Sequence, residues 1–178
     1  MKVIKRILII ILLIIIFIVA GFVYKGHELY KQALEKISIS DKVAEIKSDE
    51  NYTKLEDMSE FYKDAVIAVE DRRFYEHGAI DPIALARAIY SNIKAKELRE
   101  GGSTITQQLV KNITQDKESS GINGILRKVK EWAKAYQVEN ELSKTQILEL
   151  YLNLILVGGR NYGVQTGAEY YFNTDASN

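Results

Sequence analysis

An uninterrupted apolar segment near the N-terminus constrains this chain more than any other feature. Residues 7–24 contain no charged and no strongly polar side chain. As a helix rising about 1.5 Å per residue, the segment nearly matches a hydrocarbon core about 30 Å thick. Three basic residues precede it, and basic residues favour the cytoplasmic side of a membrane. We therefore expect a cytoplasmic tail over residues 1–6, a transmembrane segment over residues 7–24, and the rest of the chain on the outer side.

A cleaved signal peptide is the alternative interpretation of this segment. The apolar regions of signal peptides are about 7–15 residues long and are followed by a cleavage site of small residues. The apolar run in this chain is longer, and no clear A-x-A site follows it. The pattern therefore favours an uncleaved signal-anchor and a single-pass protein of the cell membrane whose C-terminal domain is extracellular.

The composition of the remaining chain excludes several classes of protein. The 178 residues include 24 Lys and Arg against 24 Asp and Glu. Because the first 25 residues carry bases and no acids, the rest of the chain is mildly acidic, which argues against a nucleic-acid partner. The chain has no cysteine, so disulfide frameworks, cysteine-bound zinc and thiol nucleophiles are excluded.

After the apolar segment, the chain divides into a polar stretch and a helical region. Residues 25–54 are polar with scattered apolar side chains, which is typical of a juxtamembrane stalk. Beyond them, apolar side chains recur at spacings of three and four residues, which indicates α-helices, and strand signals are weak. The pattern predicts one mainly α-helical domain over residues 55–178.

Helix starts are marked by side chains that can accept a hydrogen bond from the first helical turn. These capping signals are Ser59, Asp81-Pro82, Ser103 after Gly101-Gly102, and Ser143 with Gln146 as a capping box. The first predicted helix spans residues 59–74, and the third ends near Asn112. After a polar loop over residues 113–124, a further helix is indicated by an apolar stripe. This stripe consists of Ile125, Val129, Trp132 and Tyr136.

Glu70 is the first candidate for a catalytic role. It lies one step from an apolar stripe, with Val66 one turn before it and Phe74 one turn after it. A carboxylate at the edge of an apolar face suits a general acid or base. An ordinary boundary glutamate paired with Arg73 is the alternative, and this feature alone favours the alternative.

Glu131 is the second candidate. Arg127 and Lys128 precede it by four and three residues and share its helix face, and Lys130 is adjacent in sequence. Such a cluster could hold a diphosphate, with the carboxylate orienting the bases. A solvated face of ordinary ion pairs is the alternative, and the spacing alone favours it.

A third group of polar residues lies in the segment 101–112. Thr104, Gln107, Gln108 and Lys111 fall on one helical face, after two glycines and a capped N-terminus. The arrangement is compatible with an anion or sugar site, and equally with a polar face toward solvent.

Histidine offers little support for a metal site. His77 has no second histidine near it in sequence, because His27 belongs to the stalk. A structural, hydrogen-bonding role is therefore expected for His77.

Taken in order, five segments resemble the motifs of the peptidoglycan glycosyltransferases, family 51 of the glycosyltransferase classification. This domain occurs in class A penicillin-binding proteins and in monofunctional transglycosylases. The segments are EDRRFYEHGAIDP (70–82), GGSTITQQLVKN (101–112), RKVKE (127–131), KTQILELYLN (144–153) and GRNYGVQTGAEYYF (159–172). The resemblance covers roughly residues 55–172. Family domains continue with further helices, whereas this chain ends at Asn178, so the resemblance implies a C-terminally truncated domain.

The resemblance carries expectations about fold and site. It implies a mainly α, lysozyme-like glycosyltransferase domain with a larger lobe and a membrane-facing jaw. Glu70 matches the family's catalytic glutamate, and Glu131 matches its second essential glutamate. The positions expected to bind substrate are Asp71, Arg73, Phe74, His77, Ser103, Thr104, Gln107, Gln108, Lys111, Arg127, Lys128 and Lys130.

The resemblance also implies an activity in cell wall biogenesis and the maintenance of cell shape. Lipid II would be polymerised into β-1,4-linked glycan strands, with inversion and release of the undecaprenyl diphosphate carrier. The implied partners are lipid II, the growing glycan, the membrane and other cell-wall synthesis proteins of a bacterium. No obligatory cofactor is implied, although Mg²⁺ or Mn²⁺ could assist. The alternatives are an inactive anchored remnant that binds lipid II or a cell-wall partner, and a lysozyme-like lytic enzyme.

The apolar segment generates a test of topology. Because basic residues precede residues 7–24, a reporter fused after Asn178 should be active only outside the cytoplasm. Alkaline phosphatase and green fluorescent protein fusions measure the two orientations. A fluorescent cytoplasmic fusion with inactive phosphatase would contradict the predicted topology.

Overall fold

The computed structural model describes residues 38–97, 101–114, 120–159 and 161–178, together with Gly21, Tyr24, Glu28 and Lys31. Within these ranges, no helix has both the length and the apolar character needed to cross a membrane. The predicted transmembrane segment, residues 7–24, lies outside the described residues except for Gly21 and Tyr24, and it stays a prediction.

The described part of the chain is mainly α-helical, as the sequence predicts. Its helices are α2 (Ile39–Lys47), α3 (Glu60–Glu70), α4 (Pro82–Ala95), α5 (Ile105–Thr114), α6 (Gly121–Glu141), α7 (Lys144–Leu154) and α8 (Val164–Phe172). Short 3-10 helices cover Leu55–Asp57 (η1) and Phe74–Glu76 (η2). A small antiparallel hairpin, which the sequence did not predict, joins β1 (Leu156–Gly158) to β2 (Asn161–Tyr162).

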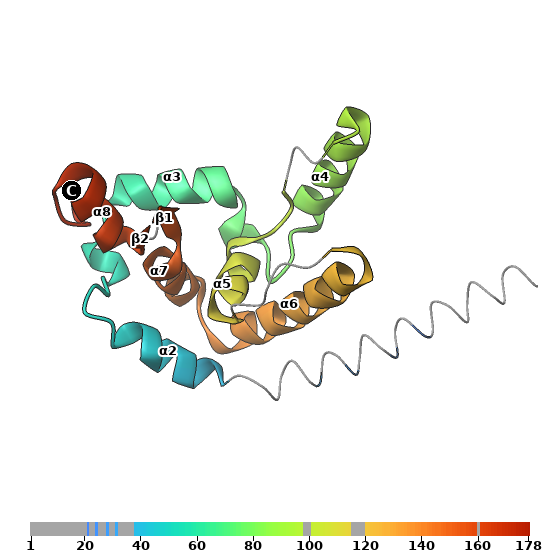
Figure 1. Ribbon diagram of the computed structural model, residues 1–178, viewed down its shortest axis with the longest axis horizontal. Helices are drawn as coiled ribbons and strands as arrows, with labels where there is room; N and C mark the ends of the chain where they lie inside the picture. Colours follow the sequence, from blue (N-terminus) through green and yellow to red (C-terminus); the bar gives the residue numbers. More distant parts are fainter. Residues whose placement is uncertain are drawn as a thin grey trace, which may run out of the picture.

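The helix α5 lies at the centre of the molecule, between α6 and α7 (Figure 1). Its apolar side chains Ile105, Leu109 and Val110 are almost fully buried, as are Ile147 and its apolar neighbours on α7. Full burial of one such side chain contributes about 1.5–3 kcal/mol. The core around α5 and α7 is therefore the frame on which the more exposed elements are placed.

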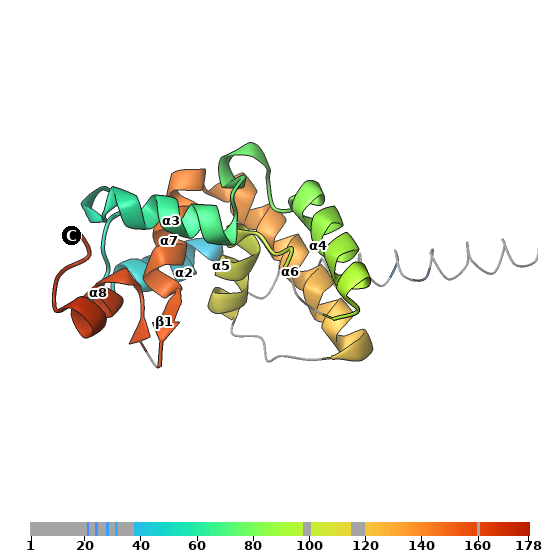
Figure 2. The same ribbon diagram turned by 90° about the horizontal axis from the view of Figure 1, so that it is seen from above.

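The elements α4 and α8 lie at opposite ends of the molecule (Figures 1 and 2). The helix α4 makes only a narrow contact with the rest: Ala88 is buried, whereas Ile89 and Ile93 are 51% and 72% exposed. These two apolar side chains stay exposed because α4 projects at the end of the molecule.

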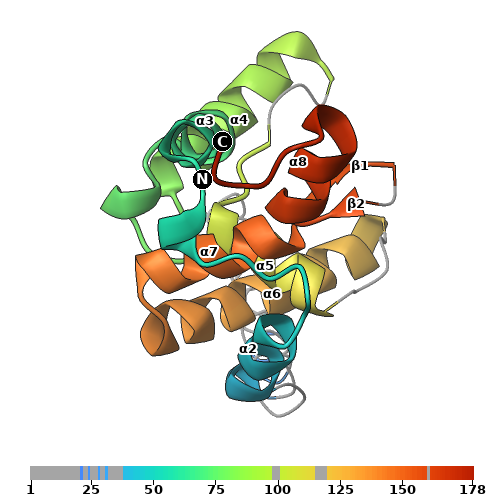
Figure 3. The ribbon, with the colours of Figure 1, turned by 90° about the vertical axis from the view of Figure 1, so that its left-hand side faces the viewer.

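The helices nearest the two ends of the described domain, α2 and α8, both pack on α7 (Figure 3). The helix α2, which falls within the predicted stalk, packs on α7 and buries Ile39 in the core. The C-terminal segment runs beside the start of α3, where the Ser59 backbone N–H donates to the Ala176 carbonyl at 2.9 Å.

The capping predictions are confirmed in part. Ser143 and Gln146 form the reciprocal capping box of α7, and the Asp81 carboxylate accepts hydrogen bonds from the first turn of α4. Ser59 occupies the N-cap position of α3, but its side chain makes no capping hydrogen bond. At α5 the cap is Thr104 and not Ser103, because the Thr104 hydroxyl accepts the Gln107 N–H at 3.2 Å.

Two helices differ from their predicted extent. The helix α3 ends at Glu70, four residues before the predicted end, because Asp71 adopts φ −155° and ψ 70°. The helix α6 begins at Gly121, inside the predicted loop.

The buried face of α6 differs from the apolar stripe that the sequence predicts. Ile125 and Tyr136 are mainly exposed. The face toward α5 instead buries Ala135 and Val138, together with the charged side chain of Glu131.

Candidate functional site

Glu70 is the last residue of α3 and stands at an open cleft of about 600 Å³. Its side chain is exposed, and its Oε2 accepts a hydrogen bond of 2.8 Å from the Gln108 amide nitrogen. The cleft is lined by the end of α3, the following first-motif segment and residues 101–104. The first motif and the start of the second thus face one another across this cleft.

The Gln108 amide has a second partner in the core. The Tyr151 hydroxyl of α7 donates to the Gln108 carbonyl oxygen at 3.1 Å. Three helices are thereby connected in one chain of hydrogen bonds, from Tyr151 through Gln108 to Glu70.

Asp71, next to Glu70, is buried and holds the first motif against α5. Its Oδ2 accepts the Ile105 backbone N–H at 3.0 Å, and its Oδ1 lies 2.7 Å from the Nε2 of His77. The first N–H groups of a helix have no partner within the helix and carry the positive end of its dipole, so a carboxylate is stabilised there. The other ring nitrogen of His77 lies 2.7 Å from the Gly78 carbonyl. Both residues act structurally in this geometry.

Arg73 pairs with Asp81 and not with Glu70. Its Nε donates to Asp81 Oδ2 at 3.1 Å, and its terminal nitrogen binds Oδ1. The same carboxylate accepts the backbone N–H groups of Ile83 and Ala84 at 2.9 and 3.0 Å. The Arg73 hydrogen bond is the main cause that lowers the pKa of Asp81 to about 2. The interpretation of Glu70 as a partner of Arg73 is therefore wrong.

Thr104 and Gln107 also join the first motif to α5. Both side chains are buried, and both donate to the Ala79 carbonyl, at 2.9 and 2.8 Å. The interpretation of this helix face as a solvent face is wrong for these two residues. Phe74 is likewise buried, with the Lys144 ammonium 4.3 Å above its ring centre.

The second glutamate, Glu131, is only 7% exposed and is surrounded by cations. Arg127 lies 3.2 Å from its Oε2, and the Lys128 ammonium binds its Oε1. Lys128 also donates to the Ser103 hydroxyl at 3.0 Å, and Ser103 lines the cleft. The interpretation as a solvated face is wrong for Glu131, because its side chain is buried. A buried carboxylate depends on the cations that pair with it. The third motif is thus connected to the cleft wall.

The two remaining predicted binding residues are less enclosed. Lys111 is exposed in the last turn of α5, three residues after Gln108, and therefore lies on the same side of that helix. Lys130 is half-buried on α6.

Among the described residues, Asp71, His77 and Asp81 are the group whose oxygen and nitrogen atoms lie close enough to hold a metal ion, within 4.8 Å of one another. These three side chains do not fit a metal ion, because other hydrogen-bond donors already occupy their oxygens. The Asp81 oxygens accept from Arg73 and two backbone N–H groups, and the Asp71 oxygens accept from Ile105 and His77. A cation there would replace these donors and meet the positive charge of Arg73. The expected role of a divalent cation stays a prediction.

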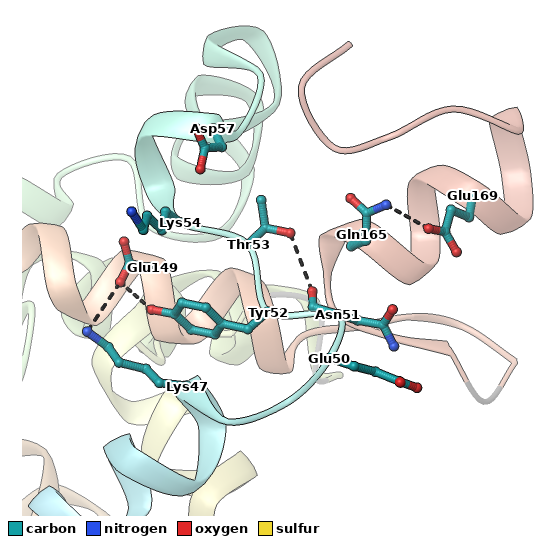
Figure 4. A pocket seen from close by; sticks show the side chains of 10 residues that line it. All are labelled: Lys47, Glu50, Asn51, Tyr52, Thr53, Lys54, Asp57, Glu149, Gln165 and Glu169. Carbon is teal, nitrogen blue, oxygen red and sulfur yellow. Dashed lines mark hydrogen bonds and ion pairs between the residues drawn. The ribbon is translucent and has the colours of Figure 1, made fainter.

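A second polar cavity, of about 690 Å³, lies where the chain crosses from α2 to α3 (Figure 4). Glu149 of α7 accepts from the Tyr52 hydroxyl and, at 2.8 Å, from the Leu55 backbone N–H. One turn later, Asn153 pairs with both backbone groups of Thr53 at 2.8 Å. Two polar side chains of the fourth motif, Glu149 and Asn153, therefore bind the segment that joins α2 to α3.

Sequence reasoning missed the polar role of Tyr151, which it quoted only as part of the fourth motif. The available signal was the hydroxyl itself, because a buried tyrosine hydroxyl requires a hydrogen-bonding partner. The identity of that partner depends on tertiary packing.

Comparison with known proteins gives a match that includes all five motifs. A family model described as Transglycosylase matches residues 39–178. The chain belongs to the transglycosylase family. It is 44% identical over 126 residues to penicillin-binding protein 1A of Neisseria flavescens, and 39% identical over 166 residues to penicillin-binding protein 1F of Bacillus subtilis. It is also 40% identical over 148 residues to a monofunctional glycosyltransferase of Staphylococcus saprophyticus.

These similarities cover most of this chain but only part of each relative. The three alignments include 71%, 87% and 82% of this chain. They span 15% of the Neisseria protein, 22% of the Bacillus protein and 53% of the Staphylococcus protein. The family resemblance inferred from the five motifs is confirmed.

The Arg73–Asp81 pair predicts a specific pH dependence of stability. A carboxyl group with a lowered pKa in the folded state contributes stability above its unfolded pKa and loses it as the pH falls through the folded value. Between pH 4 and pH 2, the chain should therefore lose up to about 2 kcal/mol through Asp81. Asp81→Asn should be less stable at pH 7 and should lack this loss.

Chemical unfolding at pH 7, 4, 3 and 2 measures the effect. Glu76→Gln is the matched control, because Glu76 is an exposed carboxylate 3.8 Å from the same Arg73. It should retain the acid-dependent loss of the parent. The same loss in Asp81→Asn as in the parent would contradict the role of this pair.

Proposed function

We propose that this chain is a peptidoglycan glycosyltransferase that polymerises lipid II into β-1,4-linked glycan strands. The observation that carries the proposal is the placement of Glu70, whose carboxylate is exposed at the cleft and accepts from a neutral amide. A carboxylate without a cationic partner among the described residues is suited to accept a proton. Membership of the transglycosylase family supports the same reaction class.

The reaction is a displacement with inversion at an anomeric carbon. The 4-hydroxyl of the acceptor sugar attacks C1 of the donor sugar, and its proton passes to Glu70. The new O4–C1 bond forms as the bond from C1 to the diphosphate oxygen breaks, and undecaprenyl diphosphate leaves. General-base assistance of this kind contributes about 10²- to 10⁴-fold in rate.

Cationic side chains would stabilise the departing diphosphate. Arg127 and Lys128 are held by Glu131, and Lys128 reaches the cleft wall at Ser103. Lys111 adds a further positive charge beyond Gln108 on α5. Charge-assisted hydrogen bonds from such groups are stronger than neutral ones. Glu131 in this mechanism orients the cations and takes no proton.

The predicted anchor gives this activity a location. A lipid-linked donor and acceptor diffuse in the plane of the membrane, and a tethered domain meets them at raised effective concentration. We therefore propose a bacterial cell-membrane enzyme with its domain on the outer side.

Two other functions compete with this proposal. A lysozyme-like lytic enzyme would also use one glutamate, but it would have no need for the Arg127, Lys128 and Glu131 cluster beside the cleft. An anchored remnant would bind lipid II or a cell-wall partner without turnover. The exposure of Glu70 at the cleft favours the enzyme over the remnant.

Replacement of Glu70 tests the base. Glu70→Gln preserves size and can still bond to Gln108, but it cannot take up the proton of the acceptor. We expect polymerisation of lipid II to fall by about 10²- to 10⁴-fold, with the helical circular dichroism and lipid II binding retained. The control is Glu60→Gln at the other end of α3, where Glu60 pairs with Lys63. Turnover by Glu70→Gln at the level of the Glu60→Gln control would remove Glu70 as the base.

Replacement of Lys128 tests the diphosphate site. Lys128→Met removes the cation that connects Glu131 to Ser103, so a charge-assisted contact worth about 1.5–3 kcal/mol is lost. Binding of a lipid diphosphate analogue should weaken by about ten-fold or more, measured by titration into detergent-solubilised protein. Lys42→Met on α2, whose ammonium binds Glu45, is the control and should bind as the parent does. Equal affinities of the two variants would place the diphosphate elsewhere.

A further inference from the structure

Tyr151 is a deeply buried residue whose hydroxyl is connected to the cleft by hydrogen bonds. Its side chain is 1% exposed within α7, yet its hydroxyl donates to Gln108 at 3.1 Å. Burial, with the negative charge of Glu70 nearby, raises the pKa of Tyr151. The hydroxyl therefore keeps its proton at neutral pH and remains a hydrogen-bond donor.

The Tyr151 hydroxyl and the Glu70 carboxylate together determine which way the Gln108 amide faces. With the carbonyl oxygen bound to the hydroxyl, the amide nitrogen points to Glu70 Oε2 at 2.8 Å. A flipped amide would bring its oxygen against the carboxylate oxygen and lose that hydrogen bond. On the core side, the orientation of Gln108 is thus supported by Tyr151, a buried residue that cannot reach substrate.

We propose that Tyr151 is a positioning residue for Glu70 and acts through the Gln108 side chain. The amide holds Oε2, so Oε1 is the oxygen left to receive the proton of the acceptor hydroxyl. A carboxylate held in this way needs no reorientation before proton transfer, which is the advantage of a preorganised base. This inference rests on the proposed function, because it assumes that Glu70 is the base.

The variant Tyr151→Phe removes the hydroxyl and keeps the ring that packs in the core. We expect kcat for lipid II polymerisation to fall by about ten-fold, the scale of one lost hydrogen bond, with KM within about two-fold of the parent. Tyr52→Phe is the matched control, because it removes a tyrosine hydroxyl bound to Glu149 on the same helix α7. It should lower the melting temperature and leave kcat unchanged. Parental kcat in Tyr151→Phe would overturn the proposal.

A double-mutant cycle separates positioning from a general effect on packing. If Tyr151 acts through Gln108, then Tyr151→Phe should cause no further loss of kcat in a Gln108→Ala background. Losses that add in full would overturn the proposal, because they would show that Tyr151 acts independently of the amide.

A measurement without turnover tests the same contact. In protein labelled with ¹⁵N-glutamine, the side-chain amide resonance of Gln108 should shift in Tyr151→Phe and in Glu70→Gln. An unchanged resonance in Tyr151→Phe would overturn the proposal. The proposed function fails separately, if Glu70→Gln retains parental turnover. Loss of turnover in Glu70→Gln with parental kcat in Tyr151→Phe would remove the positioning role alone.

Discussion

The hydrogen bond from the Ile105 backbone N–H to the buried Asp71 carboxylate is the contact on which the site depends. It joins the end of α3 to the start of α5 across 34 residues of sequence, at 3.0 Å. Since Glu70 immediately precedes Asp71, this contact places Glu70 opposite Gln108, one turn into α5. Thr104 and Gln107 reinforce the junction through the Ala79 carbonyl. Much of the polar character of the first two motifs therefore serves to assemble the cleft, which leaves Glu70 exposed within it.

Charge is distributed differently on the two sides of this junction. On one side, Asp81 is neutralised by Arg73, so the acidic first motif does not surround Glu70 with uncompensated charge. On the other, Glu131 is buried beneath two cations, and a buried carboxylate is tolerated only when it is paired and hydrogen-bonded. Glu131 thereby holds Arg127 and Lys128, and Lys128 reaches the cleft wall at Ser103. The two glutamates that sequence reasoning singled out thus occupy opposite environments, one exposed and one enclosed by cations.

The sequence predicted those features that depend on interactions between residues close together in the chain. The helical class, the Ser143 capping box and the Asp81-Pro82 start are confirmed, and the i, i+3 and i, i+4 contacts of Glu131 follow from helix geometry. The end of α3 was not predictable, because the Asp71 carboxylate that stabilises the turn finds its partner on another helix. The burial of Thr104 and Gln107 and the link from Tyr151 to Gln108 were missed for the same reason. The exposure of Ile125 and Tyr136, two members of the stripe predicted for α6, shows that periodicity identifies a helix but not the face that becomes the core.

We propose that this domain joins sugars by inversion at a lipid diphosphate donor. The most direct measurement is product analysis after the full chain, reconstituted in lipid vesicles, is incubated with lipid II. We expect glycan polymer with β-1,4 linkages, assigned by the anomeric proton coupling in NMR, and one undecaprenyl diphosphate released for each bond formed. Retained α configuration, cleavage of preformed glycan without polymer, or unchanged lipid II would contradict it.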